Sequence, residues 1–135
     1  MKTLTNNQKY FGILTLIFST IFFYYLYSAL QTHSFDNIWL FAISFGAALF
    51  ITGLVLGYND SVRKSRTDLG FQYHLITFII VNVVGIPWLL ISMGLNNETL
   101  INAAFQCIPW GIGLFVHYYF SSRSIKGINK KEIFD

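Results

Sequence analysis

The chain has 135 residues, of which 54% are apolar, 19% aromatic and only 11% charged, and its formal net charge is +3. Soluble domains carry about a quarter of charged residues, and one water-soluble core of this size cannot hide so much apolar surface. The composition therefore excludes an ordinary soluble domain and indicates an integral membrane protein, whose positive charge reflects orientation and attraction to anionic lipid, not binding to nucleic acid.

The first apolar run follows a short basic head and extends from Tyr10 to Leu30. It exceeds the apolar core of a signal peptide, about 7 to 15 residues, and no clear cleavage site follows, so we expect it to be retained. After a polar turn over residues 31–37, a second run extends from Ile38 to Tyr58. Each run has about twenty residues, enough to cross roughly 30 Å of hydrocarbon as a helix. Together they predict an N-terminal helical hairpin over residues 10–58.

Small residues recur at four-residue spacing in the second run. Gly53 and Gly57 form a GxxxG motif, and Ala42 and Gly46 form a second pair of small residues. Residues four apart share one face of a helix, and small ones let another helix backbone approach closely. We expect this face to pack within the bundle or to form the seam of a homo-oligomer.

A connection from Tyr58 to Gly70 leads to a third apolar run, from Phe71 to Met93. A turn over residues 94–99 then leads to the fourth run, from Leu100 to Phe120. These two runs predict a second helical hairpin over residues 71–120. The sequence thus predicts an all-α integral membrane protein, a single membrane domain of four transmembrane helices arranged as two antiparallel hairpins.

The positions of the charges test this topology independently of hydropathy. All nine lysines and arginines lie in the head, in the middle connection or in a basic tail of residues 121–135, and the two short turns have none. Basic residues concentrate on the cytoplasmic side of membrane proteins. We therefore expect both termini and the middle connection to lie in the cytoplasm. None of the four runs contains a carboxylate.

Two histidines lie inside the predicted spans, His74 near the start of the third run and His117 near the end of the fourth. Because these runs are antiparallel, both imidazoles should reach the same depth, roughly 5 Å below the headgroups. Ionisable side chains within a membrane segment are candidate functional groups. Three interpretations remain open: interfacial histidines bonded to water, backbone or tyrosines such as Tyr73, ligands of a metal ion or haem, or a proton-responsive pair.

Geometry separates the candidate ligands of this histidine pair. Neighbouring helices pack about 8 to 10 Å apart, which suits two imidazoles on one metal ion but is tight for a haem between them. A haem bound by two histidines would need diagonal helices or a second subunit. Two histidines alone make a poor metal site, and Cys107 lies roughly 15 Å from His117 along the fourth helix, so it cannot complete the site within one chain.

Other polar groups are candidates for contacts between the helices. Asn82, in the middle of the third run, is expected to bond across to the fourth near Cys107, Pro109 or Trp110. The indole N–H of Trp110 itself needs a partner at that depth. The small residues that would let a neighbouring helix approach the fourth one are Gly111 and Gly113.

The two ends of the second hairpin resemble the bacterial 2TM domain family, over residues about 65–123. That family's pattern is an aromatic, histidine-containing start of one helix, an asparagine about two turns later, and a Trp-Gly-x-Gly-Leu-x-x-His motif near the end of the next. The matching residues are Phe71, Tyr73, His74, Asn82, Trp110, Gly111, Gly113, Leu114 and His117. The resemblance implies a bacterial cytoplasmic membrane protein; the family has no established function, and its domain occurs alone or attached to signalling modules such as sensor histidine kinases. This chain differs in its added N-terminal hairpin and in having no kinase or DNA-binding part.

Three classes of function are compatible with these features. The first is a small multi-pass membrane interaction or signalling module, oligomeric or bound to another membrane protein in the bilayer, without catalytic activity of its own. The second is a metal- or haem-binding module that uses His74 and His117. The third is a small transporter or pore, against which the lack of charged groups within the runs speaks. An enzyme is least supported, since the sequence offers no nucleophile with a plausible base and no acidic pair.

Overall fold

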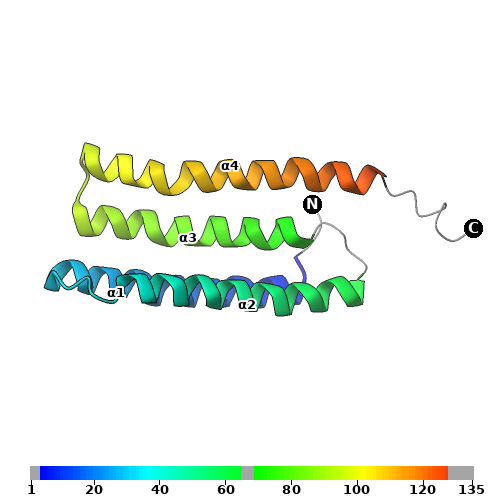
Figure 1. Ribbon diagram of the computed structural model, residues 1–135, viewed down its shortest axis with the longest axis horizontal. Coiled ribbons are helices and arrows are strands. Elements are labelled where there is room, and N and C mark those ends of the chain that lie inside the picture. The colour runs from blue at the N-terminus through cyan, green and yellow to red at the C-terminus, as the bar shows by residue number, and fades with distance from the viewer. Residues whose placement is uncertain (1–3, 65–68, 128–135) are drawn as a thin grey trace, which may run out of the picture.

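The computed structural model describes residues 4–64 and 69–127, with the backbone alone for residues 61–64, 69 and 121–127. The described chain is all-helical, and each helix is long and apolar enough to cross a membrane. Consecutive helices run antiparallel (Figure 1). The prediction of an all-α chain with four span-length helices is confirmed. The helices are α1 (Asn6–Thr32), α2 (Ile38–Lys64), α3 (Leu69–Met93) and α4 (Asn97–Gly127).

All four helices extend beyond the apolar runs. α1 begins at Asn6 and α3 at Leu69, α2 continues past Tyr58 to Lys64, and α4 continues past Phe120 to Gly127. The connection and the tail expected from the sequence are thus partly helical, because the residues that end an apolar run, such as lysine and arginine, are good helix formers. The remainder of the connection and of the basic tail, residues 65–68 and 128–135, lies outside the described residues.

Local backbone geometry explains where α1 begins and where α1 and α3 end. The Thr5 hydroxyl accepts the Gln8 N–H at 3.1 Å, and the Gln8 side chain accepts the Thr5 N–H at 2.9 Å, which forms a capping box. After α1, His33 adopts a left-handed conformation with φ of 52°, and after α3 Gly94 has φ of 75°. Such a residue stops a helix and turns the chain back toward the next one.

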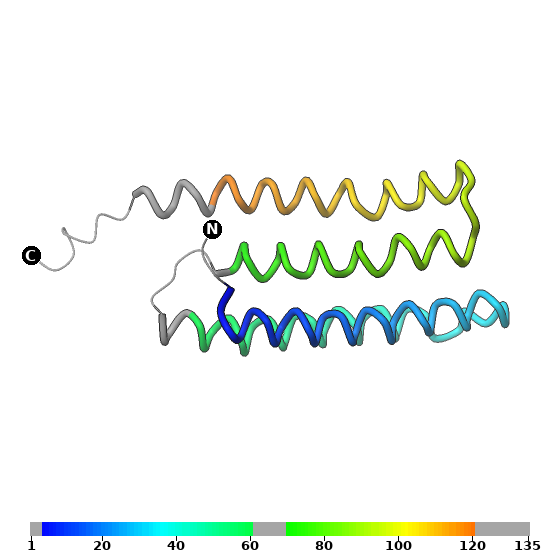
Figure 2. Tube along the Cα trace, turned by 180° about the vertical axis from the view of Figure 1, so that it is seen from behind, coloured from blue at the N-terminus to red at the C-terminus, as the bar shows by residue number. Residues whose placement is uncertain are grey.

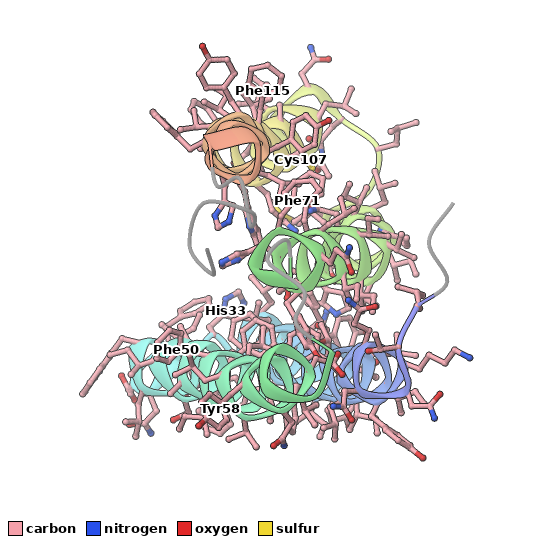
Figure 3. All side chains as sticks on the ribbon, turned by 90° about the vertical axis from the view of Figure 1, so that its right-hand side faces the viewer. His33, Phe50, Tyr58, Phe71, Cys107 and Phe115 are labelled. Carbon is pink, nitrogen blue, oxygen red and sulfur yellow. The ribbon has the colours of Figure 1, made fainter. Side chains whose placement is uncertain are left out.

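α3 is the central helix of the bundle. It contacts α1, α2 and α4, whereas α4 contacts α3 alone among the described helices. Viewed from one end, α1 and α2 lie side by side, α3 lies over them, and α4 lies on the far side of α3 (Figure 3). The view from behind also shows α1 beside α2, with α3 between this pair and α4 (Figure 2). The bundle is therefore open on both sides of α4.

The core lies between α1, α2 and α3. Phe11 of α1 packs against Tyr73 of α3, with ring centroids 4.9 Å apart, and a second cluster joins Phe23, Leu49 and Val81 from the three helices. Residues three or four apart on α1 share its inner face. The buried residues that form this face are Gln8, Phe11, Thr15, Ser19 and Phe23.

Gly85 marks the closest approach of three helices. A Cβ atom at this position of α3 would lie 2.5 Å from Cζ of Phe23 in α1 and 2.8 Å from Nε2 of Gln106 in α4. Helices surrounded by lipid associate through such close packing at small residues. Gly85 therefore leaves room for side chains of α1 and α4 to meet beside the same point of α3.

Three of the five glycines expected to mediate packing face a neighbouring helix. A Cβ atom on Gly53, Gly57 or Gly111 would meet an aromatic side chain of α1 or α3 at 3.4 to 3.8 Å. The GxxxG face of α2 thus packs within the bundle. Gly46 and Gly113 have nothing within 4 Å of the Cβ position in the described part of the chain, so they do not mediate contacts within one copy.

We expect Gly85→Ala to destabilise the fold, because the added methyl group forces the Phe23 ring and the Gln106 side chain to move. Overpacking of this kind costs about 1 to 3 kcal/mol. The measurement is the thermal unfolding midpoint of the purified protein in detergent. Gly46→Ala, at a position with open space, is the matched control; an equal midpoint for both variants would contradict the close approach at Gly85.

Candidate functional site

His74 and His117 lie next to each other on α3 and α4. Their ring centroids are 5.2 Å apart and their planes are inclined by 57°. The antiparallel hairpin brings them together because one lies near the start of its helix and the other near the end of its own. The two histidines singled out from the sequence therefore form one pair.

Aromatic and backbone groups of the first turn of α3 surround His117. The Phe71 ring lies 6.4 Å from the His117 ring and 5.1 Å from the Tyr118 ring, measured between centroids, and Phe71 lies between α3 and α4 (Figure 3). A Cβ atom on Gly70 would lie 3.7 Å from Nε2 of His117. The imidazole of His117 therefore lies beside the N-terminal end of α3, at van der Waals distance from the position a Cβ atom would take on Gly70.

Both histidines are exposed in a single copy of the chain. The pair lies at the contact between α3 and α4, and α4 has no other neighbour within the described bundle. An imidazole forms hydrogen bonds or coordinates an ion more favourably than it contacts apolar groups. The exposed pair is thus available to a ligand or to a partner that approaches from outside the bundle.

The pair supplies two ligands for a metal ion and not more. Among the described residues, no group of three or more His, Cys, Asp and Glu side chains could hold a metal ion. A haem between the two rings does not fit, because its axial histidines bind iron from opposite faces of the porphyrin. Here the two ring centroids are only 5.2 Å apart, which leaves no slot for a macrocycle between them.

A second polar cluster lies at the same end of the bundle, around Asp60 of α2. Asp60 is 2% exposed. Its Oδ2 atom accepts hydrogen bonds from the Thr5 hydroxyl and, at 3.1 Å, from the Tyr73 hydroxyl, and its Oδ1 atom accepts one from the Asn7 amide at 3.0 Å. One carboxylate thus joins the start of α1, the end of α2 and the start of α3.

Asp60 was not singled out from the sequence, because it lies two residues beyond the second apolar run, which ends at Tyr58. Helix α2 continues past that run, and its span-length segment is Ile38–Asp60. Asp60 is tolerated there because three neutral donors solvate its carboxylate. One sequence signal at this cluster was the capping pattern Thr5-x-x-Gln8, which predicts that α1 begins directly before the first run. Thr5 of this pattern is one of the residues that bond to Asp60.

Tyr73 and His74 are consecutive residues of α3, but they belong to different polar clusters: Tyr73 contacts α1 and α2, and His74 contacts α4. Tyr73 was considered a partner of the histidines, but its hydroxyl bonds to Asp60 and its ring packs on Phe11 of α1. Next to this contact, the Gln8 side chain donates a hydrogen bond to Oε1 of Gln72. The first turns of α3 thus hold α1 and α2 on one side and the imidazole of α4 on the other.

Asn82 provides the polar contact between α3 and α4 deeper in the bundle. Its Oδ1 atom accepts from Sγ of Cys107 at 2.9 Å and from Nε2 of Gln106 at 3.4 Å, and its Nδ2 atom donates to the backbone oxygen of Phe78 at 2.7 Å. The Trp110 ring meets Phe78 edge-on, with centroids 5.9 Å apart. Asn82 is 8% exposed, so these bonds satisfy a buried amide and hold the hairpin together.

Comparisons with known proteins give no relative for this chain: no family model, no curated protein and no solved structure matches it. Fold and site together define an all-helical protein with four candidate membrane-spanning helices, an exposed histidine pair and a buried carboxylate that joins three helices.

We expect Tyr73→Phe to lower the stability of the fold by about 1.5 to 3 kcal/mol, the range for a hydrogen bond to a charged group. The ring remains packed on Phe11, so the loss reports the bond to Asp60. Asp60→Ala should cost more, because three donors lose their acceptor. The measurement is thermal unfolding in detergent, with Tyr58→Phe as the control since Tyr58 is 71% exposed. Equal midpoints for the two tyrosine variants would show that the bond contributes nothing.

Proposed function

We propose that this protein is a small multi-pass membrane interaction module that works as an oligomer and has no catalytic activity of its own. Its location would be the bacterial cytoplasmic membrane, with both termini in the cytoplasm. The observation that carries the proposal is the exposed pair of His74 and His117 on the open side of the α3–α4 contact. The resemblance of this hairpin to the 2TM domain supports it.

Apolar outer faces support insertion in a bilayer. Large apolar side chains cover the outside of the bundle, such as Phe50 and Tyr58 on α2 and Phe115 on the side of α4 away from α3 (Figure 3). Helices satisfy their backbone hydrogen bonds internally, as a segment that crosses hydrocarbon must. A water-soluble four-helix protein would carry charged side chains at these positions.

The arrangement of helix ends supports the cytoplasmic location of both termini. The start of α1, the end of α2, the start of α3 and the end of α4 lie at one end of the bundle (Figure 1). The basic residues within those helix ends are Lys9, Arg63, Lys64, Arg123 and Lys126. The turns at the opposite end contain no lysine or arginine, so one end of the bundle is basic and the positive-inside rule assigns it to the cytoplasm.

The exposed imidazoles favour a protein partner at this surface over contact with lipid alone. A polar pair inside a span is costly to leave against hydrocarbon, and the open side of α4 leaves room for a neighbour. A partner that covers this side would remove the pair from lipid and supply it with hydrogen bonds or further ligands.

The second candidate function is binding of a metal ion at the same pair, favoured by the 5.2 Å separation of the rings. One feature supports a transporter as a further candidate function: the carboxylate of Asp60 lies at the end of the span-length segment of α2. The hydrogen bonds to Asp60, however, connect helices to one another, which is a role in assembly.

Labelling of single cysteines tests the orientation. In a Cys107→Ser background, which keeps a donor for Asn82, we expect Ser34→Cys in the turn after α1 to react with a membrane-impermeant maleimide on intact cells. Asn6→Cys at the start of α1 should react only after the membrane is opened. The reverse pattern, or reaction of both residues on intact cells, would contradict the proposed orientation.

Light scattering of the protein purified in mild detergent without a chelator tests oligomerisation. We expect a protein mass of at least twice the 15.5 kDa of one chain, and crosslinked multimers in native membranes. A 15.5 kDa species in detergent together with no crosslinked species in membranes would overturn the proposal that the module works as an oligomer.

A further inference from the structure

We propose that His74 and His117 from two copies of the chain form one four-histidine site for a divalent transition metal such as Zn²⁺. The two copies would be related by a two-fold axis along the membrane normal, with the metal on the axis. This inference rests on the proposed oligomer and assigns both its contact surface and its ligand.

The spacing of the two rings matches two ligands of a tetrahedral ion. Zinc lies about 2.0 to 2.1 Å from a histidine nitrogen, so it lies about 3.2 Å from the ring centre, and a tetrahedral angle then separates two ring centres by about 5 Å. The His74 and His117 centroids are 5.2 Å apart, and their planes are inclined by 57° rather than stacked. The pair therefore already has the ring separation that two ligands of one tetrahedral ion require.

One chain supplies only half of such a site. Structural zinc sites are almost always four-coordinate, whereas the described residues of one copy contain no set of three or more His, Cys, Asp and Glu side chains around an ion. Both imidazoles are exposed, so the missing ligands can reach the ion from outside the bundle. A second copy of the same pair supplies the two ligands that are missing.

Membrane symmetry makes a second copy the natural source of those ligands. A two-fold axis along the membrane normal keeps every residue at its own depth, and it brings a surface patch against the same patch of the partner. The two histidine pairs then meet at one level. Neutral imidazole is a ligand suited to zinc, copper and nickel, and the site lies close enough to the headgroups for an ion to enter from water.

Gly113 provides an independent indication of where the copies meet. It lies four residues before His117, on the same face of α4, and no described atom lies within 4 Å of its Cβ position. A small residue at this point lets a second helix approach closely beside the histidine pair. Within one copy, this absence of a side chain has no packing role.

The first experiment measures metal content, mass and spectrum of the full chain in detergent. The protein is stripped with EDTA and titrated with Zn²⁺ while its mass is followed by light scattering, and Co²⁺ serves as a spectroscopic probe of geometry. We expect one metal ion per two chains, a dimer that forms with Zn²⁺ and dissociates with EDTA, and the intense visible bands of tetrahedral Co²⁺.

Substitution of either histidine provides the second experiment. His74→Ala or His117→Ala should weaken Zn²⁺ binding by more than the roughly 100-fold that loss of an outer-shell partner costs, because two-fold symmetry removes two ligands at once. His33→Asn is the matched control: His33 follows α1 at the opposite end of the bundle with φ of 52°, a conformation that asparagine tolerates. This control should bind and dimerise as the unmodified chain does.

A third pair of variants separates dimerisation from folding. Gly113→Leu should prevent the Zn²⁺-dependent dimer and leave the unfolding midpoint of the EDTA-treated protein unchanged, since it adds bulk to open space. Gly46→Leu adds the same bulk to open space on α2 and should leave the dimer intact. Equal behaviour of the two variants would overturn the proposed contact surface.

The outcomes distinguish this inference from the proposed function. An oligomer that persists unchanged in EDTA and binds no Zn²⁺ would refute the four-histidine site but not the proposed interaction module. One ion per monomeric chain, with no crosslinked species in membranes, would refute both and leave metal binding within one copy. A monomer that binds no Zn²⁺ and gives no crosslinked species in membranes would also refute both proposals.

Discussion

The structure depends on two kinds of contact between its helices, close packing at small residues and interhelical hydrogen bonds. These are the contacts through which apolar helices associate in a bilayer, where lipid tails are as apolar as leucine. α3 supplies both kinds of contact to each of its neighbours: Gly85 permits the close approach of Phe23 and Gln106, Asn82 bonds to Cys107 of α4, and Tyr73 bonds to Asp60 of α2. The other helices are arranged around these contacts.

These contacts are distributed unequally among the four helices, and the candidate site lies at the helix that has the fewest neighbours. α1 has a buried inner face, its capping residue Thr5 bonds to Asp60, and α2 packs along it, so these two helices and α3 form the core of the bundle. α4 has one neighbour in the described chain and carries His117 beside His74 at that contact. The ionisable pair thus lies at the helix that has the most surface left for a partner.

The helices, and the position of the two histidines at the same level along α3 and α4, could be predicted from the sequence. The length of the apolar runs and the antiparallel connection determine both. The sequence was not sufficient for Asp60, since the apolar run stops at Tyr58 although the helix does not. The sequence also did not show that Gly85 is a packing position. Gly85 has no small residue four positions away to form a recognisable motif, and the residues that crowd it come from α1 and α4. The helices are apolar on all sides, so periodicity shows neither that α4 lacks contact with α1 and α2 nor which face α1 buries.

The adjacency of Tyr73 and His74 links the two polar clusters mechanically. Consecutive residues leave a helix about 100° apart around its axis, and here one points to Asp60 while the other points to His117. Any twist of α3 about its axis must therefore displace the phenol and the imidazole together. The anchoring of the first hairpin and the spacing of the imidazoles consequently depend on two consecutive residues of α3.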